Sequence, residues 1–258
     1  LKESTVDVIV PFSPAHTPKK YLNRALNTIE EQTITTNAII VTDDEQHGPS
    51  WARNTGMDRA SERFVAFCDA DDYWKPSKIE QQVEGLLETD ASLSITQTRK
   101  KESGEKNVSP CDTTSEFVND VMLRRSYSFT SSMLIDRKKV QPEFNGKLTH
   151  REDHLFALQA ASKGVCFVPE PLTIIQKHSE GLSQREGDPE KRLSDAEVFL
   201  QHAIEAFPHI KEYQSEYWHR IYYTCGRSHY SQGNYCRAIE LLKKSLTNRF
   251  NYEKSRWF

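Results

Sequence analysis

The sequence predicts an α/β fold in which helices flank a mostly parallel sheet, with an α-helical extension after it. Three observations support this prediction. Apolar runs alternate with segments of helical periodicity through the first two thirds of the 258 residues. Several of these runs end at Pro or Asp, as buried strands do when they reach the edge of a sheet. After Gly187 the sequence becomes polar and helical, and Gly226 and Gly233 are its only glycines.

Apolar runs place the strands and apolar spacing places the helices. The runs predict strands at residues 6–11, 38–41, 64–68, 93–96, 131–135, 165–168 and 172–175. We expect the first three of these strands to be buried. Apolar residues three or four apart predict helices at residues 17–29, 52–60, 76–87 and 152–163. The first has Thr17 as its N-cap and Pro18 in its first turn, and the third has Leu87 on its apolar face.

The change in composition divides the chain into residues 1–187 and a helical extension, residues 188–258. In the extension, Cys225-Gly226, Tyr230, Gly233, Tyr235 and Ala238-Ile239 have a spacing similar to that of a tetratricopeptide repeat. A single repeat cannot bury its own apolar face. We therefore expect the extension to pack against the main domain or to carry a homodimer contact.

Composition excludes several classes of function. Lys and Arg number 34 and Asp and Glu 37, so the net charge of −3 argues against nucleic acid as a partner. No apolar run reaches 18 residues, so no transmembrane segment is expected, and the first residues do not resemble a signal peptide. Five cysteines without a C-x-x-C pair indicate a reducing cytoplasm and no zinc site. We expect a cytoplasmic protein, with peripheral contact at a membrane as the alternative.

The most informative run is Phe67-Cys68-Asp69-Ala70-Asp71-Asp72, in which three carboxylates follow an apolar strand. Like charges this close repel one another, and a cation relieves the repulsion. Oxygen ligands suit a hard divalent ion, Mn²⁺ or Mg²⁺, which usually binds one or two carboxylates together with substrate phosphates. The run therefore predicts chemistry on a phosphate-bearing substrate.

Two other predicted strands are also followed by Pro or Asp. Pro11 follows the first strand, and Asp43-Asp44 follow the second. In a parallel sheet, ligands bind beyond the carboxyl ends of the strands. We therefore expect Pro11, Asp43, Asp44 and the Asp69-Ala70-Asp71 segment to line one crevice.

Together these residues resemble glycosyltransferase family 2, the inverting enzymes with the GT-A (Rossmann-like) fold, over residues 5–185. Val8-Ile9-Val10-Pro11 is similar to the family's opening strand, and Val41-Thr42-Asp43-Asp44 to its V-D-D turn. The segment 48–56 (GPSWARNTG) is close to G-x-x-x-A-R-N-x-G, and residues 67–72 match F-L-D-x-D-D. Glu152-Asp153 match an E-D pair that opens a helix, and His178 and Ser183 resemble a late His–Ser element.

The resemblance implies a role for each matching residue. Asp153 would be the catalytic base that deprotonates a hydroxyl acceptor: a glycan, a lipid-linked glycan or a protein. Asp71, Asp69 and His178 would hold Mn²⁺ or Mg²⁺. The nucleotide-diphosphate sugar, a UDP- or GDP-sugar, would be bound by Pro11, Asp43, Asp44, Arg53, Asp69, Ala70 and Glu152. The helical extension would then border the acceptor side.

The sequence departs from the family pattern in places, and other functions stay open. The segment between Asp44 and Gly48 is short, and Gln159 and Gln176 stand where the family often has Arg. One alternative is another metal-dependent enzyme on phosphates, such as a phosphatase or nucleotidyltransferase. Against it, the acidic run follows the third strand, and no glycine-rich loop follows the first. The second alternative is a non-catalytic module that binds nucleotide sugars; intact Asp69, Asp71 and Asp153 argue against such decay.

Overall fold

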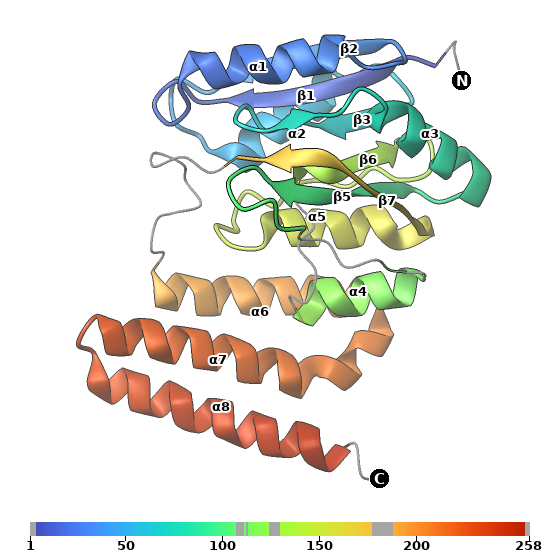
Figure 1. Ribbon diagram of the computed structural model, residues 1–258. Helices are drawn as coiled ribbons and strands as arrows, with labels where there is room; N and C mark the ends of the chain where they lie inside the picture. Colours follow the sequence, from blue (N-terminus) through green and yellow to red (C-terminus); the bar gives the residue numbers. More distant parts are fainter. Residues whose placement is uncertain (1–3, 107–110, 112, 124–129, 177–187, 256–258) are drawn as a thin grey trace.

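A computed structural model describes residues 4–106, 111, 113–123, 130–176 and 188–255. In these residues a seven-stranded sheet lies at one end of the molecule, and three long helices of the C-terminal region are stacked at the other end (Figure 1). The predicted α/β class and the predicted helical extension are both confirmed.

The sheet is mixed, with strand order β2-β1-β3-β6-β5-β7-β4. β1 runs parallel to β2 and β3, and β5 runs parallel to β7. β6 runs antiparallel to β3 and β5, and β4 runs antiparallel to β7. The strands are β1 Val6–Phe12, β2 Thr36–Thr42, β3 Phe64–Phe67, β4 Tyr73–Trp74, β5 Leu93–Lys100, β6 Met133–Asp136 and β7 Val165–Ile175.

Eight α-helices occur in the described residues; the first five accompany the strands, and the last three form the C-terminal stack (Figure 1). They are α1 Lys19–Glu30, α2 Pro49–Arg59, α3 Lys78–Thr89, α4 Thr114–Leu123, α5 Glu152–Ala160, α6 Pro189–Ala206, α7 Gln214–Ser231 and α8 Tyr235–Ser255. Short 3₁₀ turns occur at η1 Thr130–Ser132, η2 Ala161–Lys163 and η4 Pro208–Tyr213. None of the helices in the described part of the chain is both long and apolar enough to cross a bilayer.

Several details differ from the sequence predictions. The sheet is mixed instead of mostly parallel, because three of its six strand pairs are antiparallel. The N-cap of α1 is Pro18 instead of Thr17. β2 is an edge strand, and most of its side chains are partly or fully exposed instead of buried.

The two predicted strands around Pro169 and Pro171 form the single strand β7. Proline has no N–H to donate to a neighbouring strand, and the register of β7 against β5 shifts at Gln97, which lets the strand continue through both prolines. Leu87 on α3 is 46% exposed, so it lies off the apolar face of that helix.

Two hydrophobic clusters fill the two sides of the sheet. One is formed by α1 and α3 against β1 and β3. The other contains the rings of Phe67, Phe144 and Phe156, with centroids 4.0–5.5 Å apart. The second cluster continues without a break to Phe199 of α6 and Tyr217 of α7. The extension therefore shares the core of the main domain. This confirms the expectation that the extension packs against that domain.

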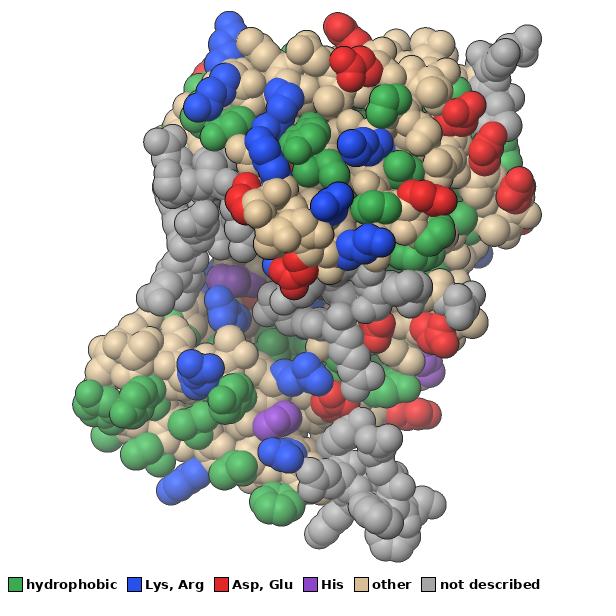
Figure 2. Space-filling model, viewed as in Figure 1, with side chains coloured by type: hydrophobic (Ala, Val, Ile, Leu, Met, Phe, Trp, Pro, Cys, Tyr) green, Lys and Arg blue, Asp and Glu red, His purple; other side chains and the backbone are tan. Residues whose placement is uncertain are grey.

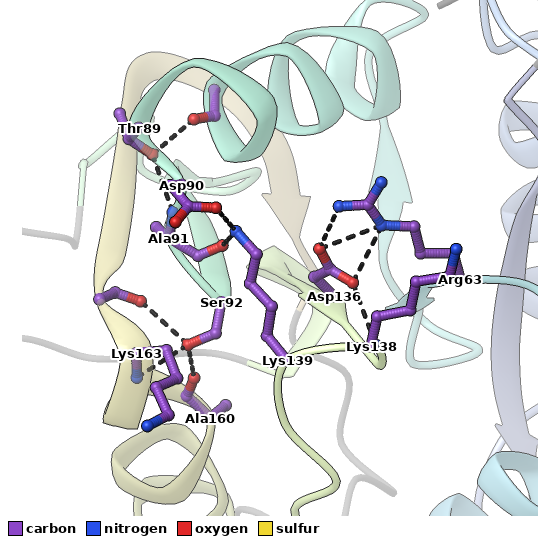
Figure 3. Close-up of polar contacts among 12 residues, drawn as sticks. Arg63, Thr89, Asp90, Ala91, Ser92, Asp136, Lys138, Lys139, Ala160 and Lys163 are labelled. Atoms are coloured by element: carbon purple, nitrogen blue, oxygen red, sulfur yellow. Dashed lines mark hydrogen bonds and ion pairs between the residues drawn. The ribbon is translucent and has the colours of Figure 1, made fainter.

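Buried polar contacts join β3, β5 and β6 at the edge opposite the carboxyl ends of β1–β3 (Figure 3). Asp136, at the end of β6, is fully buried and accepts hydrogen bonds from the Arg63 guanidinium, with Nη2–Oδ2 at 2.6 Å. Ser92, just before β5, donates its hydroxyl to the Ala160 carbonyl at 2.6 Å and accepts from the Lys163 N–H at 3.1 Å. These bonds hold α5 against the sheet.

The shared core makes a testable prediction. The Phe199 side chain is fully buried and stacks on Tyr217. We expect Phe199→Ala to lower the free energy of unfolding of the whole chain by about 3–5 kcal/mol, because it leaves a cavity in a core that both regions share. Denaturant unfolding should still show one transition. The control Leu87→Ala should change stability by less than about 0.5 kcal/mol; two separate transitions in the wild type would contradict the shared core.

Candidate functional site

The carboxyl ends of the three parallel strands β2, β1 and β3 meet at one edge of the sheet, as the sequence predicts. Pro11 of β1 pairs with Val41 of β2, and the Asp43 N–H donates to the Phe12 carbonyl at 2.8 Å. On the other side of β1, the Cys68 N–H donates to the Ile9 carbonyl at 2.9 Å. The ends of these strands therefore bring Pro11, Asp43 and Asp69 to the same edge.

The loop after β2 is organised by Asp43. Its carboxylate accepts hydrogen bonds from the N–H groups of His47 at 2.9 Å and Gly48 at 2.8 Å. Burial opposes ionisation, but these N–H groups outweigh it and lower the pKa of Asp43. Gly48 has a φ of 100°, which suits glycine, and α2 begins directly after it. Asp43 therefore sets the start of α2, while Asp44 is exposed; nucleotide binding by either remains a prediction.

Contacts in the structure explain the residue type at three positions of the Ala-Arg-Asn-x-Gly segment of α2. Asn54 holds the backbone of Phe144, with hydrogen bonds of 2.8 and 2.9 Å to its carbonyl and N–H. A Cβ on Gly56 would lie 2.4 Å from Cγ2 of Ile9, so glycine lets α2 lie close on β1. These contacts fix the turn of α2 that carries Arg53, which directly precedes Asn54 and is 6% exposed.

Arg53 is the cation at the centre of the site. Its Nη2 donates to Oδ1 of Asp69 at 2.9 Å, and its Nη1 lies 4.0 Å from Oε1 of Glu152. Burial opposes its charge, but the negative charges of Asp69, Glu152 and Asp153 raise the pKa of Arg53. The guanidinium also lies 5.2 Å from the centroid of the Phe144 ring. One buried cation thus joins the acidic turn after β3 to the start of α5.

The acidic turn is held in place from several sides. The Asp69 N–H donates to the Ser131 hydroxyl at 3.0 Å, and that hydroxyl donates to Oδ2 of Asp72 at 2.6 Å. The indole N–H of Trp74 donates to the Ser131 carbonyl at 3.0 Å. Arg24 of α1 donates to the Asp71 carbonyl at 2.5 Å. The backbone of the turn is therefore fixed.

The three carboxylates of this turn have different surroundings. Asp72 is buried, 5% exposed, and also accepts the Gln176 N–H at 3.1 Å. Burial, followed by the negative charges of Asp71 and Asp69, raises the pKa of Asp72 well above its usual range. The side chains of Asp69 and Asp71 are only partly buried. Asp72 therefore supports the turn, and Asp69 and Asp71 are the carboxylates that can face a ligand.

These residues fit a divalent cation that binds together with a phosphate. No group of three or more metal-ligating side chains occurs in the described residues. Two carboxylates on one turn nevertheless suit Mg²⁺ or Mn²⁺, because such ions take their remaining ligands from water and phosphate oxygens. The negative charges of Asp71 and Asp69, which add to burial in raising the pKa of Asp72, also favour a cation here. His178, the third expected ligand, lies outside the described residues.

The start of α5 carries the Glu152-Asp153 pair. Arg151 precedes it with a φ of 69°, a left-handed backbone conformation that is rare for a residue with a side chain. Its guanidinium donates to the Val121 and Met122 carbonyls at 2.7 and 2.9 Å and lies 3.9 Å from the Phe199 ring centroid. Contacts with α4 and α6 therefore fix the residue that directs α5 towards Arg53.

The two carboxyl groups of this pair differ in acidity. Burial, together with the neighbouring Asp153 charge, raises the pKa of Glu152 to about 7. Burial acts in the same direction on Asp153, but His154 and then Arg53 outweigh it and lower the pKa of Asp153 to about 2. The His154 Nδ1 lies 2.7 Å from Oδ1 of Asp153. Asp153 is therefore ionised at neutral pH, while Glu152 holds a proton part of the time.

A pocket of about 250 Å³ opens beside Asp153, between the start of α5 and helices α6 and α7. His154 is 6% exposed and lines this pocket, and its buried Nε2 atom has no hydrogen-bond partner among the described residues. The extension supplies Arg192, Asp195, Ala196 and Ile221 to the walls. The helices after residue 188 therefore complete a cavity at the predicted catalytic residue.

Sequence reasoning missed three residues of this site. Arg24 and Ser131 hold the acidic turn, but they lie far from it in the sequence and belong to no motif. His154 follows the Glu-Asp pair directly, and only the structure shows its bond to Asp153. The one signal in the sequence was the pair of hydroxyl residues Ser131-Ser132 at the start of the predicted strand 131–135, which the structure places in the 3₁₀ turn η1.

Arg53 provides a second prediction. We expect Arg53→Met to lower the free energy of unfolding by about 3–5 kcal/mol near neutral pH, because it leaves buried carboxylates unpaired. Without the cation the folded-state pKa of Glu152 rises further above its unfolded value. The part of the loss that comes from Glu152 is full above this higher pKa and fades as the pH falls through about 7, the pKa of Glu152 in the folded wild type, because at lower pH both folded proteins hold the proton. Urea unfolding at about pH 5 and pH 8 should show a smaller loss at the lower pH.

The exposed Arg59, at the end of the same helix, gives the matched control. Arg59→Met should change stability by less than about 0.5 kcal/mol at either pH. A loss for Arg53→Met that is the same at both pH values would contradict the role of Arg53 as counter-ion.

Comparison with known proteins shows similarity to glycosyltransferases. The model of "Glycosyl transferase family 2" matches residues 37–152, which include Arg53, the acidic turn and Glu152. The teichuronic acid biosynthesis glycosyltransferase TuaG of Bacillus subtilis is 43% identical over 53 residues, which cover 20% of this chain and 21% of TuaG. The glucosyltransferase WfgD of Escherichia coli is 39% identical over 54 residues, 21% of each chain. The matched segment thus spans about a fifth of each relative.

Solved structures support the fold. The S. aureus TarS 1-349 structure in complex with UDP-GlcNAc superimposes with a TM-score of 0.70. The alignment covers 95% of this chain and 81% of that one, at 16% sequence identity. Residues 37–152 are therefore similar to glycosyl transferase family 2, and the chain has the GT-A fold.

Proposed function

We propose that the protein is a metal-dependent, inverting glycosyltransferase that moves a hexose from a nucleotide-diphosphate sugar to a hydroxyl acceptor. The arrangement around Arg53 carries this proposal. Its guanidinium contacts Asp69 of the acidic turn and approaches Glu152 at the start of α5. A donor held at the turn and an acceptor held beside Asp153 would therefore react within one compact site.

The donor lies along the carboxyl ends of β1, β2 and β3 in this proposal. Pro11, Asp43 and Asp44 flank the base and ribose, and Asp69 and Ala70 lie beside the diphosphate. Arg53 supplies a positive charge on the same side, and Glu152 faces the transferred sugar. The superimposed TarS structure is a complex with UDP-GlcNAc, which supports a UDP-sugar as the donor, with a GDP-sugar as the other choice.

Asp71 and Asp69 would hold Mn²⁺ or Mg²⁺, with His178 as a third ligand. When bound, such an ion neutralises the charge that develops on the departing nucleotide diphosphate. Arg53 adds a fixed positive charge that needs no reorganisation during the reaction. The fixed backbone of residues 69–72 keeps the two carboxylates in place.

Asp153 acts as the general base. It is ionised at neutral pH, and the bond from His154 fixes one of its carboxylate oxygens. The carboxylate accepts the proton of the acceptor hydroxyl as that oxygen attacks the anomeric carbon. The bond between this carbon and the diphosphate oxygen breaks in the same displacement, so the anomeric configuration inverts.

The acceptor enters through the pocket formed with α6 and α7. This pocket contains Asp153 and offers the unpaired Nε2 of His154 and the guanidinium of Arg192. Such groups suit a polar acceptor with several hydroxyl groups. TuaG and WfgD are named for teichuronic acid biosynthesis and for transfer to a GlcNAc-diphosphoundecaprenol, which supports a glycan or lipid-linked glycan over a protein.

The base assignment is tested with Asp153→Asn. We expect transfer from a UDP- or GDP-sugar to fall by about 10²–10⁴-fold, because the amide cannot accept the acceptor proton. Binding of the nucleotide diphosphate should be retained. Transfer is measured as release of nucleotide diphosphate in the presence of Mn²⁺, and nucleotide diphosphate binding is measured by calorimetry. Asp58→Asn, at an exposed position on α2, is the control; near-normal turnover of the folded Asp153→Asn protein would remove Asp153 as the base.

The metal assignment is tested by calorimetry with Mn²⁺ in the presence and absence of UDP or GDP. We expect weak binding of the ion alone and tighter binding with the nucleotide, because phosphate oxygens complete the ligand set. Asp71→Asn should abolish this increase, while its backbone carbonyl can still accept the bond from Arg24. Nucleotide binding that is unaffected by EDTA would contradict the proposed site.

A further inference from the structure

The hairpin formed by α7 and α8 carries most of the exposed large apolar side chains. Nine such residues are exposed in the described part of the chain, and six of them belong to this hairpin. Their exposed fractions range from 47% to 64%. The six are Tyr223 and Tyr230 of α7 and Tyr235, Ile239, Leu246 and Phe250 of α8.

Helical spacing places these residues on one face of the hairpin. On α8 the intervals between the four residues are four, seven and four, which form a single stripe along a helix. This stripe is separate from the side of α8 that packs on α7, where Ala238, Leu241 and Ser245 are buried. On α7 the two tyrosines are seven residues apart, and the Tyr230 and Tyr235 rings meet across the turn with centroids 5.4 Å apart.

A basic side chain lies within the apolar spacing on each helix. Arg227 lies four residues after Tyr223 and three before Tyr230, and its guanidinium is 5.9 Å from the Tyr223 ring centroid. Lys243 lies four residues after Ile239 and three before Leu246. Both are exposed. We call the six apolar residues together with Arg227 and Lys243 the hairpin face.

The hairpin is basic, although the whole chain is slightly acidic. Residues 214–250 contain six Lys and Arg against two Asp and Glu, whereas the chain has 34 against 37. Both acids already form ion pairs: Glu216 with Arg220 at 2.8 Å, and Glu240 with Arg237 and Lys244 at 2.7 and 2.8 Å. Figure 2 shows green and blue side chains gathered over the end of the molecule that α7 and α8 form.

We propose that the hairpin face docks on the surface of an anionic phospholipid bilayer. Aromatic and aliphatic side chains of this kind enter the boundary between headgroups and acyl chains, where tyrosine keeps its hydroxyl in the polar layer. Arg227 and Lys243 lay their stems along the apolar stripe and direct their charges at lipid phosphates. A second copy of the chain would present the same positive charge, so the charge pattern favours the lipid surface over self-association.

Sedimentation of the whole chain with lipid vesicles tests this proposal. We expect binding to phosphatidylcholine vesicles that contain phosphatidylglycerol, and much weaker binding to phosphatidylcholine alone. Lys243→Glu should weaken binding to the anionic vesicles by about tenfold, because it replaces an attraction with a repulsion. Ile239→Ser and Phe250→Ser should each weaken it as well, because they remove buried apolar surface.

The matched controls lie in the sheet region: Lys138→Glu and Leu87→Ser change exposed residues of the same types. Both should bind vesicles as the wild type does, and the melting temperatures of all five variants should stay close to that of the wild type. No binding to anionic vesicles, or a loss that the control variants share, would overturn the proposal. So would light scattering that shows a dimer disrupted by Ile239→Ser without any vesicle binding.

Discussion

The ion pair between Arg53 and Asp69 is the contact on which the arrangement of the site depends. Five carboxyl groups, those of Asp69, Asp71, Asp72, Glu152 and Asp153, come from two distant parts of the chain and approach one another in a poorly hydrated region. Arg53 is the buried cation that contacts the first group and approaches the second. Without it, the repulsion between the turn after β3 and the start of α5 would oppose the packing of both on the sheet.

The same constraint explains the order of acidity in the site. Asp153 gains His154 and Arg53 as neighbours and remains ionised, whereas burial and the charge of Asp153 make Glu152 take up a proton more readily. Asp72 is removed from water and held by Ser131 and Gln176. Carboxyl groups in different surroundings thus differ in pKa. These differences support the proposed roles as metal ligands, general base and structural carboxylate.

The helical extension belongs to the catalytic unit in structure as well as in proposed function. Phe199 and Tyr217 continue the core that Phe67 begins, and Arg151 contacts both helices while it sets the direction of α5. The pocket beside Asp153 is closed by α6 and α7. The far side of the hairpin is left to solvent, and there it presents the basic and aromatic hairpin face.

The sequence predicted what depends on local patterns and missed what depends on tertiary contacts. Apolar runs located the strands, and acids at strand ends predicted the edge where β1, β2 and β3 meet. The exposure of β2 could not be read from its apolar sequence, because an edge position is a property of strand order. The partners of Asp72 were also hidden, since Ser131 and the Gln176 N–H lie in the sequence far from the carboxylate they contact.

In the proposed mechanism, a divalent ion and a nucleotide diphosphate meet at the acidic turn next to Arg53. Paramagnetic broadening of amide NMR signals by Mn²⁺ in the presence of UDP or GDP tests this most directly. We expect the amide signals of Ala70 and Glu152 to broaden first, while those of Leu87 and Tyr235 stay sharp. Broadening that is centred elsewhere, or that leaves Ala70 unchanged at saturating nucleotide, would contradict metal and nucleotide binding at the acidic turn.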